Sequence, residues 1–300
     1  MDTKPRRSFI HNNHVTGLIF IGPWLIGFFG FIIIPMFISL YLSFTNYNLI
    51  SPPEWVGMKN LVRMFTADEL FSKSIVVTFQ YVFLSVPARL IFALAVAMLL
   101  SQKRWFSSFY RIIYYIPSIL GGSVAVAIVW RMIFGSRGPL SAVFKILTGS
   151  SYSLIGDPNL ALLSIVLLSM WQFGSSMLIF LAGIKNIPTH YYEAAVIDGA
   201  GSIRKFFHIT LPLLSPVILF NLIMQTIAAF KMFTQAYIVT AGGPMNNTLV
   251  YSLYLFKRAF LFSEMGYASA MAWILLVIIS IITAIFFKTS NRWVFYEGGK

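Results

Sequence analysis

The chain has 300 residues, of which 58% are hydrophobic and only 10% are charged. An ordinary globular protein carries about 25% charged residues, so this chain has too little charge to cover a water-soluble fold. Its net charge of +13 results from 22 Lys and Arg against 9 Asp and Glu residues. The basic residues lie in short clusters between apolar runs, which argues against a nucleic-acid partner. The absence of cysteine excludes disulfides, thiolate metal sites and thiol nucleophiles. The composition therefore predicts a membrane protein solvated in part by lipid.

Six stretches approach or exceed the length of about 20 apolar residues that a helix needs to cross a membrane. In chain order they cover residues 17–44, 74–100, 109–134, 160–184, 211–233 and 268–287. The first follows Lys4, Arg6 and Arg7 and far exceeds the apolar core of a signal peptide, about 7–15 residues, so we expect it to be retained as a span. We predict an all-α membrane protein with a single transmembrane domain over residues 1–300.

An even number of spans places both ends of the chain on one side of the membrane. If that side is the cytoplasm, the cytoplasmic segments are the shorter ones and hold more Lys and Arg per residue. This is the charge bias of the positive-inside rule. We therefore predict a multi-pass protein of the bacterial inner membrane with both termini in the cytoplasm.

The second predicted span contains one charged residue, Arg89. A charge in the middle of a span costs about 2.5–3.5 kcal/mol on insertion scales, and such residues usually face protein or water. Two interpretations stay open. Arg89 either snorkels or bonds to a neighbouring helix, or it lines a translocation path and suits an acidic sugar.

Uncharged polar residues lie in the fourth and fifth predicted spans. Hydrogen bonding between helices explains many such residues in membrane proteins. Sugar hydroxyls need the same donors and acceptors, together with an aromatic platform, and Asn221 and Gln225 share a helix face because they are four residues apart. The candidate substrate path consists of Arg89, Trp171, Gln172, Asn221, Gln225 and Thr226.

The loop over residues 186–212 differs from the other connections. Thr189 is a predicted helix N-cap, and the small residues Ala194 and Ala195 would allow another molecule to approach closely. Gly199 and Gly201 should end this helix, and Ser202 should cap a second one. We expect a helix–turn–helix at the cytoplasmic surface, which is typical of a docking site for a soluble partner.

The loop resembles the EAA motif of ABC importer permeases, and every spacing of that motif is kept. The matching residues are Glu193, Ala194, Ala195, Gly199, Ile209, Leu211 and Pro212. The resemblance implies that the loop is the coupling helix seated in a groove of an ATPase subunit, with Asp198 as a further coupling residue. It also implies the type I ABC importer permease fold.

Other segments resemble carbohydrate permeases of the maltose-transporter type, and the early region is closer to the MalF-like half. They are residues 23–27, 35–45, 55–60, 240–244 with Thr248, and 293–299. The chain lacks the extra early spans and the large inserted outer domain of the maltose subunit itself. Contacts made by those parts cannot be carried over.

The resemblance implies several partners. They are a second, MalG-like permease subunit, two ABC ATPase subunits, an extracytoplasmic sugar-binding protein, and a sugar or oligosaccharide substrate. The sequence has no Gly-x-x-x-x-Gly-Lys-Ser/Thr phosphate loop, so we expect no enzyme activity and no cofactor in this chain, with ATP and Mg²⁺ bound by the ATPase subunits. The histidines show no metal-ligand spacing, so no metal site is predicted.

An ion-coupled secondary transporter is the alternative. That class commonly places ionisable residues at the membrane midplane and often contains an internal repeat. This sequence has no carboxylate within a predicted span and carries a docking loop, so the importer permease is the favoured interpretation.

Overall fold

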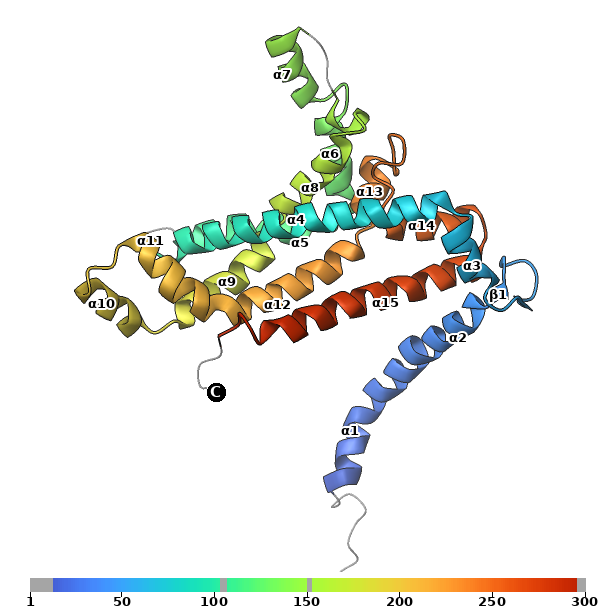
Figure 1. Cartoon of the computed structure of the whole chain (residues 1–300), viewed down its shortest axis with the longest axis horizontal. Coiled ribbons are helices and arrows are strands. Elements are labelled where there is room, and N and C mark those ends of the chain that lie inside the picture. The colour runs from blue at the N-terminus through green and yellow to red at the C-terminus, as the bar shows by residue number, and fades with distance from the viewer. Residues whose placement is uncertain (1–12, 103–106, 150–152, 296–300) are drawn as a thin grey trace, which may run out of the picture. The chain divides into compact units, whose positions relative to one another are not determined.

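The computed structural model describes residues 13–102, 107–149 and 153–295. Within them the chain is almost entirely helical (Figure 1). It divides into two compact units, Met1–Arg63 with Arg258–Trp273, and Met64–Lys257 with Ile274–Lys300. The single transmembrane domain over 1–300 stays a prediction. Lys4, Arg6, Arg7 and both termini lie outside the described residues.

The first unit begins with a continuous helical segment. It consists of α1 (Asn13–Phe28), the π-helical turn η2 (Phe29–Ile33) and α2 (Ile34–Ser43). Pro35 lies in the first turn of α2, where a proline is tolerated best. Large apolar side chains such as Phe20 and Phe31 are more than 80% exposed, which suits a helix that lipid surrounds.

A short hairpin follows the first span. Strand β1 (Thr45–Asn46) pairs antiparallel with β2 (Glu54–Trp55), and α3 (Lys59–Thr66) comes next. The Asn60 side-chain amide donates to the carbonyl oxygens of Ser43 and Thr45, both at 2.9 Å. One buried amide therefore joins the end of α2 and β1 to α3.

The first unit also contains a cluster of ion pairs. It lies beside the π-helical turn η5 (Lys257–Leu261) and the start of α15 (Met265–Ser290). The Glu264 carboxylate accepts from Arg63 and from Arg258, each at 2.9 Å, and both guanidinium groups lie over the Tyr267 ring at 4.8 and 5.1 Å from its centroid. A Cβ on Gly266 would lie 2.1 Å from the Thr45 carbonyl oxygen, so this position needs glycine.

The second unit is built on α4 (Glu69–Ser101), the longest helix described. The Asp68 carboxylate caps α4 by accepting from the Phe71 N–H at 3.1 Å, and the Tyr254 hydroxyl donates to the same carboxylate. Tyr254 belongs to α14 (Tyr251–Phe256), which packs against α4. The buried face of α4 carries small residues, among them Ala93 and Ala97, that let neighbouring helices approach.

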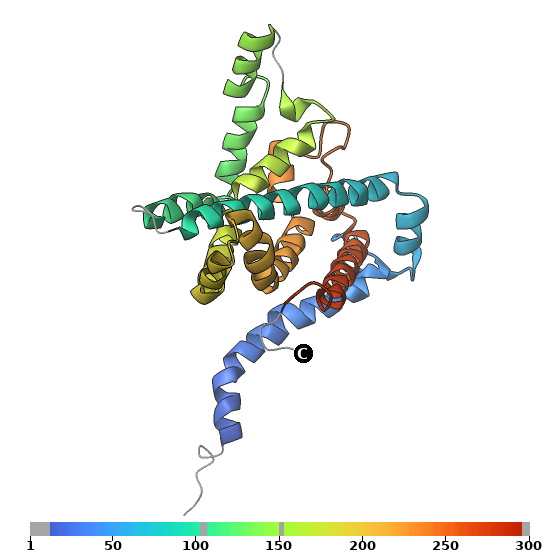
Figure 2. The same ribbon diagram turned by 60° about the vertical axis from the view of Figure 1, so that its left-hand side comes forward.

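The third predicted span, over 109–134, is not one helix. The structure has α5 (Ser107–Leu120) and α6 (Val124–Phe134), followed by α7 (Pro139–Thr148), and the chain bends by 96° at the break. The break coincides with Gly121 and Gly122, and the Ser123 hydroxyl caps α6 by accepting from the Val126 N–H at 3.3 Å. Consequently α6 and α7 point away from α4 in both views (Figures 1 and 2).

The fourth predicted span, over 160–184, is also broken. After the turn η3 (Leu154–Gly156) come α8 (Ala161–Trp171) and α9 (Gly174–Asn186), bent by 44°. A Cβ on Gly174 would lie 2.2 Å from the Tyr114 carbonyl oxygen, so this glycine lets α9 pack closely against α5. Helix α9 also packs against α4 and α12 (Leu211–Phe230).

Four described helices are long and apolar enough to cross a membrane. They are Gly17–Ser43, Glu69–Ser101, Ser202–Phe230 and Met265–Ser290. If each of the two bent pairs also forms one span, the number rises to six. The predicted number of six therefore stays a prediction, which this count of four to six helices allows. The fifth begins earlier than predicted because α11 (Ser202–Lys205) and the π-helical turn η4 (Phe206–Thr210) continue into α12. A short helix, α13 (Thr234–Val239), follows it.

Candidate substrate path and docking loop

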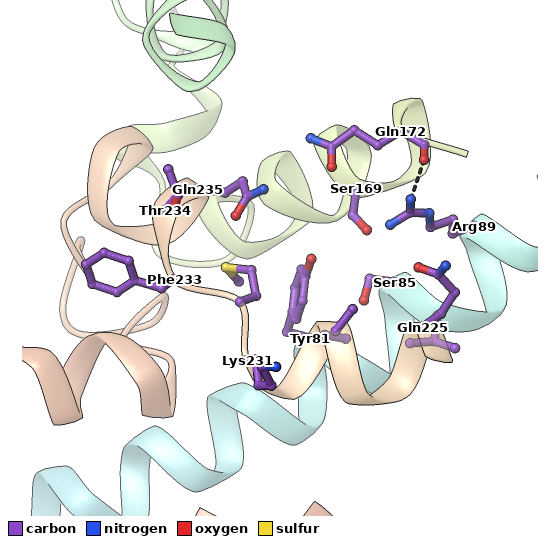
Figure 3. Close-up of a pocket in the computed structure, with 14 residues that line it drawn as sticks. Tyr81, Ser85, Arg89, Ser169, Gln172, Gln225, Lys231, Phe233, Thr234 and Gln235 are labelled. Carbon is purple, nitrogen blue, oxygen red and sulfur yellow. Dashed lines mark hydrogen bonds between the residues drawn. The ribbon is translucent and has the colours of Figure 1, made fainter. Parts of the chain in front are cut away.

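A polar pocket of about 260 Å³ lies within the second unit, between α4, α8, α12 and α13 (Figure 3). Its polar and aromatic lining residues are Tyr81, Ser85, Arg89, Ser169, Gln172, Gln225, Lys231, Phe233, Thr234 and Gln235. The two basic residues, Arg89 and Lys231, have no Asp or Glu beside them in the lining. The pocket therefore offers positive charge and uncharged hydrogen-bonding groups.

Arg89 reaches from α4 to the bend between α8 and α9. Its Nη2 donates to the Gln172 carbonyl oxygen and, at 3.4 Å, to the Ser175 hydroxyl. The Ser118 hydroxyl also donates to the Gln172 carbonyl oxygen, at 2.9 Å. A carbonyl at the end of a helix has no partner within the helix, and in a membrane protein it needs another donor. Arg89 and Ser118 provide these donors.

The two helix breaks meet at the pocket. The Gln172 side-chain amide donates to the Gly121 carbonyl oxygen at 2.8 Å, and the Gln235 amide lies 3.4 Å from the same oxygen. A Cβ on Gly121 would lie 2.3 Å from Gln172 Cδ. Gly121 thus lets the Gln172 side chain lie directly against the break between α5 and α6. Irregular backbone at membrane depth is tolerated where it is buried or lines a cavity, and here it does both.

The structure brings only part of the predicted substrate path together. Arg89, Gln172 and Gln225 line the pocket, whereas Trp171, Asn221 and Thr226 do not. The Trp171 ring lies 6.1 Å from the ring of Trp130. Thr226 is buried in α12.

Asn221 and Gln225 do not meet at this pocket, although they share a helix face. Asn221 is fully buried one turn away, and its amide nitrogen donates to the Val217 carbonyl oxygen of its own helix at 3.2 Å. Because α12 packs against both α4 and α9, this turn is covered by neighbouring helices. Asn221 and Gln225 therefore lie on the same face of α12, but neighbouring helices cover the turn of Asn221 and leave only Gln225 at the pocket.

The sequence analysis missed several lining residues. Tyr81 and Ser85 precede Arg89 at intervals of four residues and therefore form one polar stripe on α4, a signal that was present in the sequence. Lys231, Thr234 and Gln235 follow the end of α12, and only the turn of the chain after that helix brings them to the pocket.

The docking loop forms the predicted helix–turn–helix. Helix α10 (Thr189–Ile197) ends where Gly199 adopts a φ of +73°, and the Ala200 N–H donates back to the Ala195 carbonyl oxygen at 2.8 Å. A left-handed glycine of this kind is a common helix end. The predicted caps are wrong, because the cap positions are held by Pro188 and Gly201 and neither Thr189 nor Ser202 makes a capping bond.

The loop is well exposed and lies near the C-terminal end of α4 (Figure 1). Ile197, Ile203 and Phe207 expose between 57% and 87% of their surface. Of the predicted coupling residues, Glu193, Ala194, Asp198 and Gly199 are exposed, and Ala195, Ile209, Leu211 and Pro212 are partly buried. A hydrogen bond of 2.9 Å between the hydroxyls of Tyr192 and Thr210 ties α10 to η4. The loop thus projects from the packed helices and exposes apolar side chains.

Comparison with known proteins identifies the family. The family model described as "Binding-protein-dependent transport system inner membrane component" matches residues 89–296. The chain belongs to this family. It is therefore an inner-membrane subunit of a transport system that works with a binding protein.

Individual relatives are similar over nearly the whole chain. The probable ABC transporter permease protein YesP of Bacillus subtilis (strain 168) is 52% identical over 299 residues, with 99% of this chain and 97% of the relative covered. The trehalose/maltose transport system permease protein MalF of Thermococcus litoralis is 32% identical, with 97% and 99% covered. The predicted resemblance to permeases of the maltose-transporter type is confirmed.

Solved structures show the same fold. In the crystal structure of a bacterial alginate ABC transporter in complex with an alginate pentasaccharide-bound periplasmic protein, one chain matches with a TM-score of 0.81 at 20% identity. The match covers 94% of this chain and 96% of that chain. The predicted fold class, an all-α importer permease, is confirmed.

Proposed function

We propose that the chain is the permease subunit of an ATP-binding-cassette importer for a sugar or oligosaccharide that an extracytoplasmic binding protein delivers. The residues that line the pocket support a sugar as the substrate. Hydroxyl and amide side chains such as Ser169, Gln225 and Gln235 line the pocket together with the aromatic ring of Tyr81. Sugar hydroxyls require donors and acceptors of this kind. The similarity to a permease named for trehalose and maltose supports the same substrate class.

The proposed complex contains a second, MalG-like permease subunit and two ABC ATPase subunits. The ATPase subunits bind ATP and Mg²⁺ and hydrolyse ATP, and this chain is not an enzyme and holds no cofactor of its own. The exposed loop around Glu193 and Gly199 docks into the ATPase. Closure of the ATPase subunits then moves the loop, and because Tyr192 is bonded to Thr210 at the start of the fifth span, the motion passes to α12.

The proposed orientation places both termini and the docking loop in the cytoplasm. Trp55 and Gly243 then face outward. The binding protein delivers sugar from that side, and the two permease halves rock so that the cavity faces outward and inward in turn.

Reconstitution in proteoliposomes tests this function. The complex should take up a labelled sugar only with ATP inside and the loaded binding protein outside, and this chain purified alone should hydrolyse no ATP. The rival, an ion-coupled secondary transporter, predicts uptake by this chain alone under an ion gradient. Such uptake in the absence of ATPase subunits and binding protein would contradict the proposal.

A further inference from the structure

We propose that Arg89 binds the carboxylate of an anionic sugar, a uronate residue, in this pocket, and that Lys231, at the other end of the lining beyond Tyr81 (Figure 3), attracts the same anion through its charge. The inference rests on the proposed function and names its substrate class more narrowly. It starts from a charge imbalance. Two basic residues line the cavity, no acidic residue does, and neither Arg89 nor Lys231 has an ion-pair partner among the described residues.

The hydrogen bonds of Arg89 leave most of its guanidinium group unused. Both bonds come from Nη2. Nε is buried and has no partner, and Nη1 has none within the described part of the chain. A guanidinium group has five N–H donors, and buried polar groups are normally satisfied. The protein therefore satisfies one of the three nitrogens. Because Nε is shielded from the cavity, Nη1 is the nitrogen that remains for another group.

A carboxylate is the group that completes this site best. A cation inside a span costs about 2.5–3.5 kcal/mol, and an anion beside it offsets part of that cost. A hydrogen bond between a guanidinium and a carboxylate is charge-assisted and is therefore stronger than one between neutral groups. A neutral sugar would leave the positive charge of the pocket uncompensated.

The rest of the lining suits one sugar ring. Its other polar groups are uncharged, and the Tyr81 ring stands beside Ser85 and Ser169, whereas Phe233 points away (Figure 3). The cavity of about 260 Å³ is just below the range of about 300–1,000 Å³ found for drug-sized ligands. One residue of the substrate therefore occupies the pocket, and longer oligosaccharides extend beyond it.

The competing explanation is that Arg89 serves the fold alone, as a donor to the Gln172 carbonyl oxygen. That explanation does not extend to Lys231, which is exposed and makes no hydrogen bond or ion pair in the described structure. The two residues therefore provide separate tests. A structural role predicts that Arg89 matters equally for all sugars and that Lys231 matters for none.

The experiment compares matched sugars in the reconstituted complex. Labelled disaccharides of glucose, galactose and mannose are each paired with their uronate counterparts, and uptake is divided by the occupancy of the binding protein. The variants are Arg89→Gln, Arg89→Lys and Lys231→Gln. Lys145→Gln, at an exposed position in α7 away from the pocket, controls for the loss of one positive charge.

We expect uptake of at least one uronate by the unmodified complex. It should fall about tenfold or more in Arg89→Gln and severalfold in Lys231→Gln, since a tenfold change corresponds to about 1.4 kcal/mol of binding free energy. Arg89→Lys should retain more uptake than Arg89→Gln, and Lys145→Gln should match the unmodified complex.

Three results would overturn the inference. They are uptake of neutral sugars without any uronate, uronate uptake unchanged in Lys231→Gln, and an equal fall for neutral and uronate sugars in Arg89→Gln. If the complex with Arg89→Gln fails to assemble, the uptake of uronates by the Lys231→Gln complex decides whether the inference holds. An assembled, ATP-hydrolysing complex that imports neither class of sugar would instead contradict the proposed function.

Discussion

Arg89 of α4 donates through Nη2 to the carbonyl oxygen of Gln172, the residue that follows the last turn of α8. This bond joins a buried charge to an interrupted helix. Each feature would be costly alone, because a cation in a span needs a polar partner and an open helix end needs a donor. Together they satisfy each other in part, and both residues line the polar pocket.

The first prediction concerns the contact between the two helix breaks. Gly121→Ala would place a Cβ 2.3 Å from Gln172 Cδ and displace the amide that bonds to Gly121. Overpacking of this kind costs about 1–3 kcal/mol. The purified complex should unfold at a lower temperature and transport less sugar.

The neighbouring glycine provides a matched control. A Cβ on Gly122 would meet nothing within 4 Å, so Gly122→Ala should behave like the unmodified protein. Thermal unfolding followed by loss of monomeric protein measures both variants. Equal stability of the Gly121→Ala and unmodified complexes would show that the two breaks do not need this close approach.

The second prediction concerns the ion pairs of Glu264. Glu264→Gln removes the charge that Arg63 and Arg258 share over the Tyr267 ring. The side chain of Glu264 is 30% exposed and that of Arg63 42% exposed, so solvent weakens the pairs and we expect a loss of only about 1 kcal/mol. Glu54→Gln is the control, because Glu54 is exposed, belongs to the same unit and forms no ion pair with any residue that the structure describes. The result that would contradict the prediction is equal stability of the two variants at low ionic strength.

The third prediction concerns topology. Because the chain has no cysteine, single cysteines report the side of the membrane directly. An impermeant thiol reagent added outside should label Glu54→Cys in intact cells, and Asp198→Cys should react only after the membrane is opened. Both positions are exposed in the structure, so burial would not prevent labelling. Labelling of Glu54→Cys from the cytoplasmic side alone would reverse the orientation.

Sequence patterns predicted the spans and the docking loop because these depend on local composition and spacing. The turn at Gly199 needs a left-handed residue within a few positions of a short helix, and such a requirement is visible in the chain itself. The breaks at Gly121 and after Trp171 were missed, because hydropathy averaged over about 20 residues does not register two or three residues of irregular backbone.

The pocket was harder to predict because it depends on contacts between distant segments. Arg89, Gln172 and Gln225 were identified individually as polar residues in apolar spans. Which of them share a cavity depends on how α4, α8 and α12 pack, and this packing buries Asn221 one turn away. The stripe of Tyr81, Ser85 and Arg89 was the one part of the pocket that helical spacing alone could have revealed.

The final prediction concerns coupling through the docking loop. Gly199 has a φ of +73°, and nothing lies within 4 Å of a Cβ built on it. Glycine is therefore needed here for its left-handed backbone conformation, and not because a larger side chain would clash with a neighbour. A β-branched residue there is strained by about 1–2 kcal/mol or shifts the turn. Gly199→Val should therefore alter the end of α10 beside Asp198 while leaving the packed spans intact. We expect normal amounts of permease in the membrane, with weaker ATPase retention or hydrolysis without uptake.

Two companion variants separate conformation from bulk at this turn. Gly199→Asn should be milder than Gly199→Val, because asparagine tolerates the left-handed region. Gly201→Val adds the same bulk at a residue with a φ of −70° and open space around it, so it should affect coupling less than Gly199→Val if conformation is decisive. Permease abundance, ATPase co-purification and sugar uptake are measured for all three in one strain. Normal uptake and normal ATPase retention in Gly199→Val would contradict the prediction. Such a result would show that the conformation of this turn does not affect how the loop engages the ATPase subunit.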